Sequence, residues 1–440
     1  MSAVRSTPER RRWIAWAALA TAFVLVNLLR LSTAVLAEEL ASAYAATAAE
    51  LGTLHAAFFY IYAPLQIVAG VLADRAGIRR TATIGVAVMS AGALGFALAD
   101  TYPVAFAARL CIGLGGSVVF VATLRFCANW FPPRAFATMS GVTVAIAGVG
   151  GILATTPLAV AVAAAGWRAV IAGLAAVGLA LAAGVSLLVR DTPADAGLPS
   201  IAGVPDAPTL TLGEVGANAL SVLRGRDTWL AGIVLFAGTG VNITVIGLWG
   251  VPYVVQTYGV SVTRASTYTL LGSAGLLLGP PLLGRLSDRL GRRTGLIVAA
   301  TALHATAFGA LAVAASPPLL AVGAILFLTG FLAGGFTLTY TVVRERHGSA
   351  ASGVATGTVN ALGFSGAAVF PVLMGTALDT FWTGETVAGA RVYSATGYRV
   401  AFGLAALAGV AAFAAASWLH VRTRRRRGKT ETTTAGTTAD

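Results

Sequence analysis

Long apolar runs with almost no charge recur from Trp13 to Val421, and they constrain the fold of this chain more than any other feature. Most of them reach the roughly 20 residues that a helix needs to cross the hydrocarbon core of a bilayer. They are continuous, whereas transmembrane β-strands alternate apolar and polar residues over short segments. Because 57% of the 440 residues are hydrophobic and only 11% are charged, water is a poor solvent for this chain. We therefore predict an all-α polytopic membrane protein in contact with the lipid bilayer.

Polar residues, glycines and prolines divide the runs into about twelve predicted transmembrane helices. These lie near residues 13–37, 51–73, 81–99, 103–126, 135–165, 167–189, 229–258, 263–286, 295–315, 317–343, 350–379 and 398–421. Most of the 30 Lys and Arg residues then fall on one side of the membrane, and the opposite loops hold Arg168, Arg264, Arg391 and Arg399. The positive-inside rule predicts that both termini are cytoplasmic. We expect the protein to lie in the cell membrane. Since the net charge of +13 is spread over short loops, we expect no nucleic-acid partner.

One long polar stretch, residues 191–228, contains four prolines and separates six predicted helices from six. Its composition is typical of a linker. We predict an N-terminal six-helix bundle over residues 1–190, a cytoplasmic linker over 191–228, a C-terminal six-helix bundle over 229–421 and a basic tail over 422–440.

The two predicted bundles repeat one motif. Gly70-Val-Leu-Ala-Asp74-Arg75-Ala-Gly77-Ile-Arg79-Arg80 follows the second predicted helix, and Gly284-Arg-Leu-Ser-Asp288-Arg289-Leu-Gly291-Arg292-Arg293 follows the eighth. Pro157 and Pro371 are separated by the same number of residues as Asp74 and Asp288. A parallel repeat of this kind places a substrate site between the two halves, near the middle of the membrane.

These two loops resemble the signature loop of the major facilitator superfamily, and Arg109-x-x-x-Gly113-x-Gly115-Gly116 resembles the helix-4 signature of that superfamily. The resemblance covers essentially the whole chain. It implies two helical bundles around a central cavity, with the third, sixth, ninth and twelfth helices peripheral. The Gly-Pro signature of antiporters in helix 5 is not reproduced, because Thr155-Thr156-Pro157-Leu158 occupies that region.

The repeated loops are predicted to act in gating rather than in binding the substrate. A carboxylate and a guanidinium at the ends of neighbouring helices can bridge those helices when one face closes, and glycines allow a tight turn. The candidates are Gly70, Asp74, Arg75, Gly77, Arg79, Gly284, Asp288, Arg289, Gly291 and Arg292. The resemblance adds Arg109, for conformational or proton coupling.

Arg30 lies deep in the first predicted helix, and a charge at such a depth normally faces a cavity or a partner. Asn27 shares its helical face. A guanidinium is a planar donor suited to carboxylate or phosphate, so Arg30 points to an anionic or zwitterionic substrate. The alternatives are a structural ion pair with Glu38 or Glu39, or a side chain that extends to the membrane surface.

Two stripes of polar and aromatic residues accompany Arg30. The second predicted helix carries His55, Tyr62 and Gln66 on one face, and the seventh carries Asn242 and Tyr253 at helical spacing. Tyr340 and Asn360 are weaker candidates of the same kind. Such stripes fit the wall of a wet cavity, and hydrogen bonds between helices are the competing explanation.

The sequence favours a secondary transporter of a small organic anion or zwitterion over an enzyme. No carboxylate lies in the centre of a predicted helix, so the candidates for proton coupling in symport are His55 and the substrate's own carboxylate, and uniport and exchange are the alternatives. No nucleotide-binding loop and no metal-binding motif is present, and we expect no cofactor, no metal and a monomer. Efflux of apolar or drug-like compounds, and a sensor without transport, are the alternative functions.

Overall fold

The computed structural model describes residues 8–199, 211–314, 316–344 and 349–437. Each of the twelve predicted transmembrane helices, which we call crossings, is helical in the structure. Three crossings are built from more than one helical segment. In the first half these are α1 (Pro8–Leu31) with α2 (Thr33–Tyr44), α3 (Ala48–Ala76), α4 (Ile78–Ala97), α5 (Tyr102–Trp130), α6 (Pro133–Leu153) with α7 (Thr156–Ala165), and α8 (Trp167–Leu188). In the second half these are α10 (Arg226–Thr244) with the π-helix η2 (Val245–Trp249) and α11 (Gly250–Tyr258), α12 (Val262–Leu290), α13 (Arg293–Val313), α14 (Leu319–Arg344), α15 (Ser349–Asp379) and α16 (Ala395–Thr437).

The described part of the chain contains 11 helices that are long and apolar enough to cross a membrane. Helix α12 is 29 residues long but is not among them, because glycines, hydroxyl residues and the Pro280-Pro281 pair lower its hydropathy. It fills the place of the eighth predicted crossing and packs along α14. The all-α prediction is therefore confirmed.

Three elements were not predicted from the sequence. The short helix η1 (Ala194–Ala196) and helix α9 (Leu212–Leu223) lie in the predicted linker, whose residues 200–210 are outside the described part. Thr211 caps α9, and its backbone and side-chain hydrogen bonds to Glu214 lower the pKa of that carboxyl. A hairpin of β1 (Trp382–Val387) and β2 (Ala390–Tyr393) joins α15 to α16.

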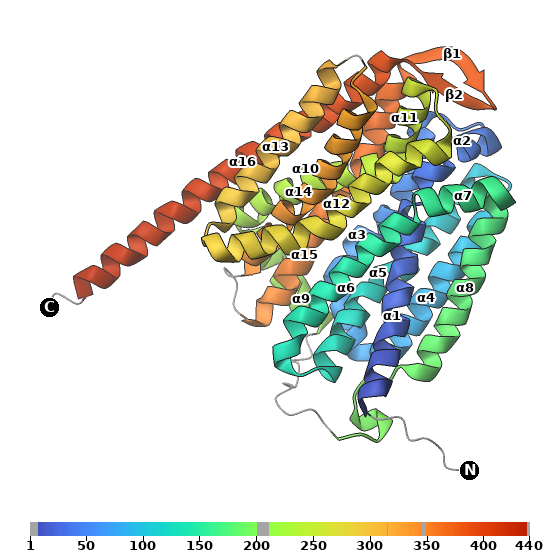
Figure 1. Ribbon diagram of the computed structural model, residues 1–440. Helices are drawn as coiled ribbons and strands as arrows, with labels where there is room; N and C mark the ends of the chain where they lie inside the picture. The colour runs from blue at the N-terminus through green and yellow to red at the C-terminus, as the bar shows by residue number, and fades with distance from the viewer. Residues whose placement is uncertain (1–7, 200–210, 315, 345–348, 438–440) are drawn as a thin grey trace, which may run out of the picture.

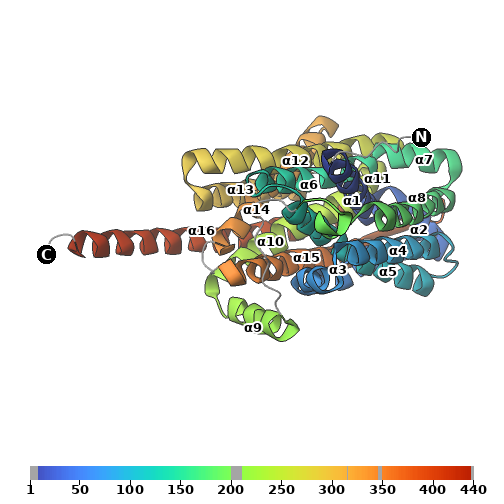
Figure 2. The same ribbon diagram turned by 90° about the horizontal axis from the view of Figure 1, so that it is seen from below.

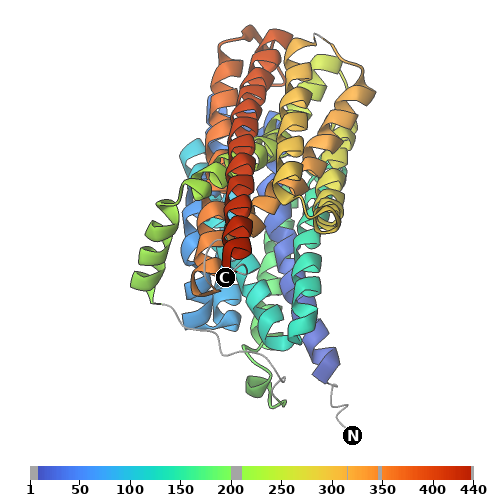
Figure 3. The ribbon, with the colours of Figure 1, turned by 90° about the vertical axis from the view of Figure 1, so that its left-hand side faces the viewer.

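Both chain ends lie at one end of the helical body, which we call the termini end, and the hairpin lies at the other, the hairpin end (Figure 1). Helix α16 runs far beyond the body at the termini end, and α9 stands apart from the main bundle (Figures 2 and 3). Residues Val215 and Ala219 of α9 pack with Ile67 of α3 and Val354 of α15, so the linker helix contacts both halves.

The two halves share one hydrophobic core at the hairpin end and have separate cores at the termini end. The largest cluster of buried residues includes Leu36 of α2, Trp249 of η2 and Phe370 of α15. Near the chain ends, one cluster contains residues of the first half and of the short segment after it, and another contains residues after 221 only. Figure 1 shows α12, α13 and α16 leaning away from α1 and α6 toward the termini end. The halves are therefore closed against each other at the hairpin end.

A carboxylate fastens this closed end. Asp379, the last residue of α15, accepts hydrogen bonds from the backbone amides of Ala48 (3.0 Å) and Ala49 (2.8 Å) at the start of α3. Those amides have no partner within their own helix, and the helix dipole favours a negative charge there. Arg391 of the hairpin lies 3.4 Å from the same carboxylate. Asp379 thus joins the second half to the first.

Candidate functional site

Arg30 lies beside a break in the first crossing. Helix α1 ends at Leu31 and α2 begins at Thr33, with Ser32 between them. The Ser32 hydroxyl donates to the carbonyl of Leu29 at 3.0 Å. In a regular helix this carbonyl oxygen would accept from a backbone amide instead. The break sets the position of the guanidinium relative to the second half of the crossing.

The charge of Arg30 is buried without a counter-charge. The residue is only 7% exposed, and its Nε atom has no hydrogen-bond partner. Within the described residues no carboxylate lies within ion-pair distance of it, so neither Glu38 nor Glu39 neutralises it. An unpaired buried charge is costly in protein and in lipid. The ion-pair alternative considered for Arg30 is therefore wrong in this conformation.

Arg30 lies beside a cluster of aromatic rings. Its guanidinium carbon lies 5.8 Å from the centre of the Phe364 ring of α15. Tyr62 packs edge-on against the same ring at 4.9 Å, and Phe59 lies parallel to it at 6.1 Å. Side chains of both halves therefore meet at Arg30. Phe364 was missed from the sequence because one more aromatic residue in a long apolar helix gives no signal.

Arg109 of α5 holds the broken segment in place. Its guanidinium donates to the carbonyl of Leu29 at 2.9 Å and to the hydroxyl of Thr33 at 3.0 Å, on either side of the break. It also donates to the carbonyl of Leu54 in α3 at 3.4 Å. Arg109 therefore links three crossings of the first half. This geometry indicates that Arg109 positions the helix segment that carries Arg30. The coupling role that the resemblance implies stays a prediction.

His55 of α3 lies between the broken first crossing and the π-helix of the seventh. It is fully buried, and neither ring nitrogen has a hydrogen-bond partner. A Cβ atom at Gly247 of η2 would lie 2.9 Å from the His55 ring and 2.9 Å from Leu31. Only glycine lets η2 approach this closely.

The irregular segments of the first and seventh crossings occupy equivalent places in the two halves. The spacing that relates Asp74 to Asp288 also relates Ser32 to Ile246, which lies inside η2. Short π-helical segments and broken helices are frequent at functional sites and in transporter substrate sites. By the same spacing Arg30 corresponds to Thr244, so the charge is present in one half only.

Asn27 and Asn242 each keep one polar atom without a partner. The amide nitrogen of Asn27 donates to the carbonyl of Phe23 at 2.7 Å, and its Oδ1 is buried and unpaired. Its Cβ lies against Gly150 of α6, so Asn27 is enclosed within the first half. Asn242 is buried in α10 with its Nδ2 unpaired. These atoms stay candidates for binding only if the helices around them move.

Gln66, Asn360 and Tyr340 form a hydrogen-bonded chain across the two halves. The Tyr340 hydroxyl donates to Oδ1 of Asn360 at 2.6 Å, and Asn360 donates to Oε1 of Gln66 at 3.2 Å. Gln66 in turn donates to the carbonyl of Ser117 at 3.2 Å. The structure thus brings three predicted residues together, with Gln66 one turn from Tyr62. They form hydrogen bonds between helices, which was the alternative to a cavity wall.

Tyr253 lies apart from Arg30. Its ring packs against Tyr258, Tyr398 and Phe402 near the hairpin end. These neighbours all belong to the second half. We therefore leave Tyr253 out of the proposed site.

The first repeated loop has a partner that was not predicted. Gly77 has a positive φ of 82°, as its turn requires. Asp191, directly after α8, accepts a hydrogen bond from the Arg79 amide at 2.7 Å, and Arg79 Nε donates to the carbonyl of Ser186 at 2.6 Å. Arg75 is exposed. The side chain of Asp74, and Gly70, lie outside the described side chains.

In the second loop, Asp288 pairs with a residue of the next helix. Its carboxylate lies 3.8 Å from Arg293, at the start of α13. The reason is that Arg293 follows the turn at Gly291, whose φ is 62°. Arg289 and Arg292 are exposed, and Gly284 has open space at its Cβ position, so no close helix approach requires that glycine.

Curated relatives of this chain are transporters. The chain is 28% identical over 265 residues to a protein described as a probable sulfoacetate transporter, SauU, of Cupriavidus necator, which covers 57% of this chain and 58% of that protein. It is 23% identical over 255 residues to the hexuronate transporter of Bacillus subtilis, covering 56% and 58% respectively. The chain therefore spans less than two thirds of the length of these relatives.

Solved structures share the fold. A bacterial homologue of the human lysosomal transporter Spinster, in an inward-facing and occupied conformation, superposes with a TM-score of 0.73 at 19% identity, over 95% of this chain and 98% of that one. The nucleoside transporter NupG gives 0.71 at 13% identity, over 92% and 98%. The sequence profile of the Major Facilitator Superfamily matches residues 15–371 and 229–439. This chain is therefore a membrane protein that belongs to the Major Facilitator Superfamily.

Proposed function

We propose that this protein moves a small organic anion across the membrane by alternating access, and that Arg30 binds the anionic group. The observation that carries the proposal is the buried charge of Arg30, which has an unpaired Nε and no carboxylate near it among the described residues. A substrate carboxylate or sulfonate would supply the missing counter-charge. Charge-assisted, two-point contacts of this kind are the strong hydrogen bonds of protein sites.

The relatives support the same substrate class. Their names specify sulfoacetate and hexuronate, and both compounds are anions at neutral pH. Tyr62 and Phe364 offer this site an aromatic wall, which suits a small solute with an apolar part. The aromatic rings come from both halves, so a ligand at Arg30 would touch both and respond to their relative movement.

We also propose how the protein is oriented in the membrane and which conformational state the structure represents. With the termini end in the cytoplasm, the basic loops and Arg-rich tail would follow the positive-inside rule. The shared core and Asp379 would then close the outer face, and the site would communicate with the cytoplasm. His55 stays a candidate for proton coupling, because its two unpaired ring nitrogens lie next to the broken helix.

Binding to the purified protein tests the proposal. Thermal unfolding of the full chain is measured with sulfoacetate, a hexuronate and, as uncharged and cationic comparisons, glucose and tetraphenylphosphonium. A specific anion should raise the melting temperature, since a ligand that binds the folded state stabilises it. Arg30→Ala should weaken its affinity by about 100-fold, and Arg30→Lys by roughly tenfold, because ammonium keeps the charge but loses the planar contact.

The control is Arg264→Ala, which removes an exposed basic residue of the hairpin end and should leave anion affinity unchanged. Unchanged affinity in well-folded Arg30→Ala protein would refute the role of Arg30. Stabilisation by the cation alone would favour the efflux alternative instead.

A further inference from the structure

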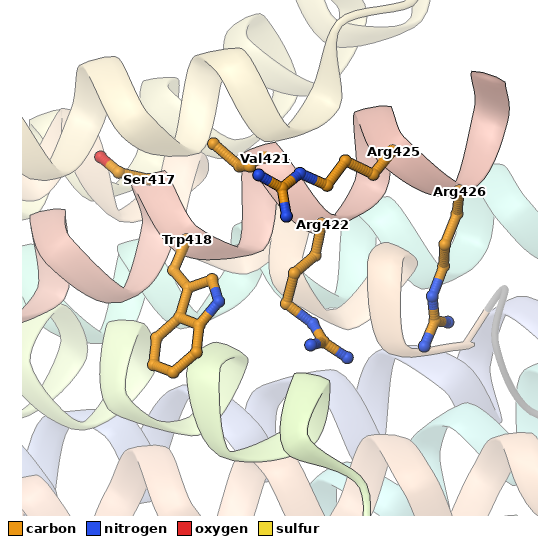
Figure 4. A pocket seen from close by; sticks show the side chains of 6 residues that line it. All are labelled: Ser417, Trp418, Val421, Arg422, Arg425 and Arg426. Carbon is orange, nitrogen blue, oxygen red and sulfur yellow. The ribbon is translucent and has the colours of Figure 1, made fainter. Parts of the chain in front are cut away.

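A basic groove lies along the part of α16 that faces the termini end (Figure 4). It encloses about 590 Å³ and is lined by Ser417, Trp418, Val421, Arg422, Arg425 and Arg426. Neither the transport site nor the repeated loops contribute to it. The transport function proposed above gives this groove no role.

The arginines of the groove divide into two groups. Arg422 lies 2.8 Å from Asp227 at the start of α10, and Arg426 lies 3.4 Å from the same carboxylate. These two residues are one turn apart, so one carboxylate can pair with both. Arg425 also lines the groove, and in Figure 4 its side chain extends along the helix on another side from those of Arg422 and Arg426. It is exposed, and among the described residues no ion pair of its guanidinium is found, so it can bind an external anion.

The groove lies at the depth of lipid headgroups. Trp418 is about 35 Å along the helix from Ala395, close to the roughly 30 Å thickness of a hydrocarbon core. Its side chain is 58% exposed, and Trp229, near the start of the neighbouring α10, is 49% exposed. Exposed tryptophans mark the interface between hydrocarbon and headgroups. Arg422 and Arg425 follow Trp418 by one and two turns, which places their charges at the level of phosphates.

We propose that this groove binds the headgroup of an anionic phospholipid from the leaflet at the termini end. Arg425 would donate hydrogen bonds to the phosphate, the Trp418 ring would pack against the glycerol and upper acyl chains, and Val421 would contact the chains. Arg422 and Arg426 would hold the start of α10 through Asp227 and add positive potential to the same groove. A bound lipid would thereby stabilise the contact between the seventh and twelfth crossings.

Native mass spectrometry of the full chain tests this proposal, with dioleoyl phosphatidylglycerol as the anionic probe and dioleoyl phosphatidylcholine as the neutral one. Phosphatidylglycerol should bind more tightly than phosphatidylcholine. Arg425→Gln should weaken phosphatidylglycerol binding by about tenfold or more, the loss expected for a charge-assisted contact, and should weaken phosphatidylcholine binding less, because the choline ammonium of that lipid offsets the charge of its phosphate. Arg425→Lys should lie between the wild type and Arg425→Gln, because it keeps the charge without the planar donor.

Arg424→Gln is the matched control. Arg424 is an exposed arginine next to Arg425 and does not line the groove, so its loss removes the same charge and should cost no more than about fivefold. Equal losses for Arg424→Gln and Arg425→Gln would show only a diffuse attraction to negative lipids and would overturn the proposal. Unchanged binding in Arg425→Gln, or equal affinity for the two lipids in the wild type, would overturn it as well.

Discussion

Replacing Asp379 by asparagine should weaken the closure of the hairpin end. The carboxylate accepts from two backbone amides at the start of α3, and Asn would present an NH₂ group to one of them. One charge-assisted hydrogen bond would be lost, and Arg391 would lose its partner. A hydrogen bond to a charged group contributes about 1.5–3 kcal/mol, and we take about 2 kcal/mol for a side chain that is one fifth exposed.

This free energy would apply only to the closed arrangement, because opening of the hairpin end in the proposed mechanism would separate α15 from the start of α3. A loss of about 2 kcal/mol shifts the ratio of open to closed molecules by roughly 30-fold. A population that is open for about 1% of the time in the wild type would rise to roughly a quarter.

Double electron–electron resonance between two spin labels can measure these populations. Labels at Thr101 and Val387 are both exposed and lie on the two halves at the hairpin end, in a Cys111→Ser background that leaves only the buried Cys127. The distance distribution should gain a longer component in Asp379→Asn. Asp100→Asn is the control, because it removes an exposed carboxylate from the same end. Identical distributions for the two variants would contradict the argument.

Three further outcomes are expected. Arg109→Gln should lower the free energy of unfolding by about 3 kcal/mol, measured by thermal or denaturant unfolding, because it removes three hydrogen bonds from α5 to the first and second crossings. Gly275→Ala should reduce the yield of folded protein on size-exclusion chromatography, since the added Cβ meets the Phe327 carbonyl of α14, whereas Gly173→Ala, which faces open space, should not. Gln66→Leu should change the transport rate, because it removes a hydrogen bond between the two halves and so alters the relative stability of the inward-open and outward-open states. The anion affinity should change less than threefold, since Gln66 bonds to Asn360 rather than to Arg30.

The positions of the crossings could be predicted because hydropathy reports directly on contact with lipid. The twelve apolar runs and the repeated loops are local features, and Gly77 and Gly291 both have a positive φ. Helix α9 and the hairpin could not be predicted, because both are short. The four residues that place α9, Val215 and Ala219 with Ile67 and Val354, come from three distant segments.

The candidate site was predictable only in part. Arg30 is conspicuous because charge is rare in an apolar run, and the structure places it where both halves meet. Asp191 and Asp379 look like ordinary helix-end residues in the sequence. Their importance comes from the hydrogen bonds that they accept from backbone amides distant in the sequence. Gln66, Asn360 and Tyr340 were found by their polarity, but only tertiary structure shows that they bond to one another.

The two breaks explain why one arginine can matter in a chain built from two similar halves. Ser32 and η2 occupy equivalent places, so each half has an irregular segment at the same depth, and the two segments meet around His55. Irregular segments of this kind are frequent at functional sites, and in the proposed mechanism the halves would move relative to each other here. Arg30 lies on one side of this junction, and its uncharged counterpart Thr244 donates to the carbonyl of Gly240 in its own helix. An anion at the junction would therefore be held by its charge to the first half and touched by Phe364 of the second, and it would follow the first half when the two separate.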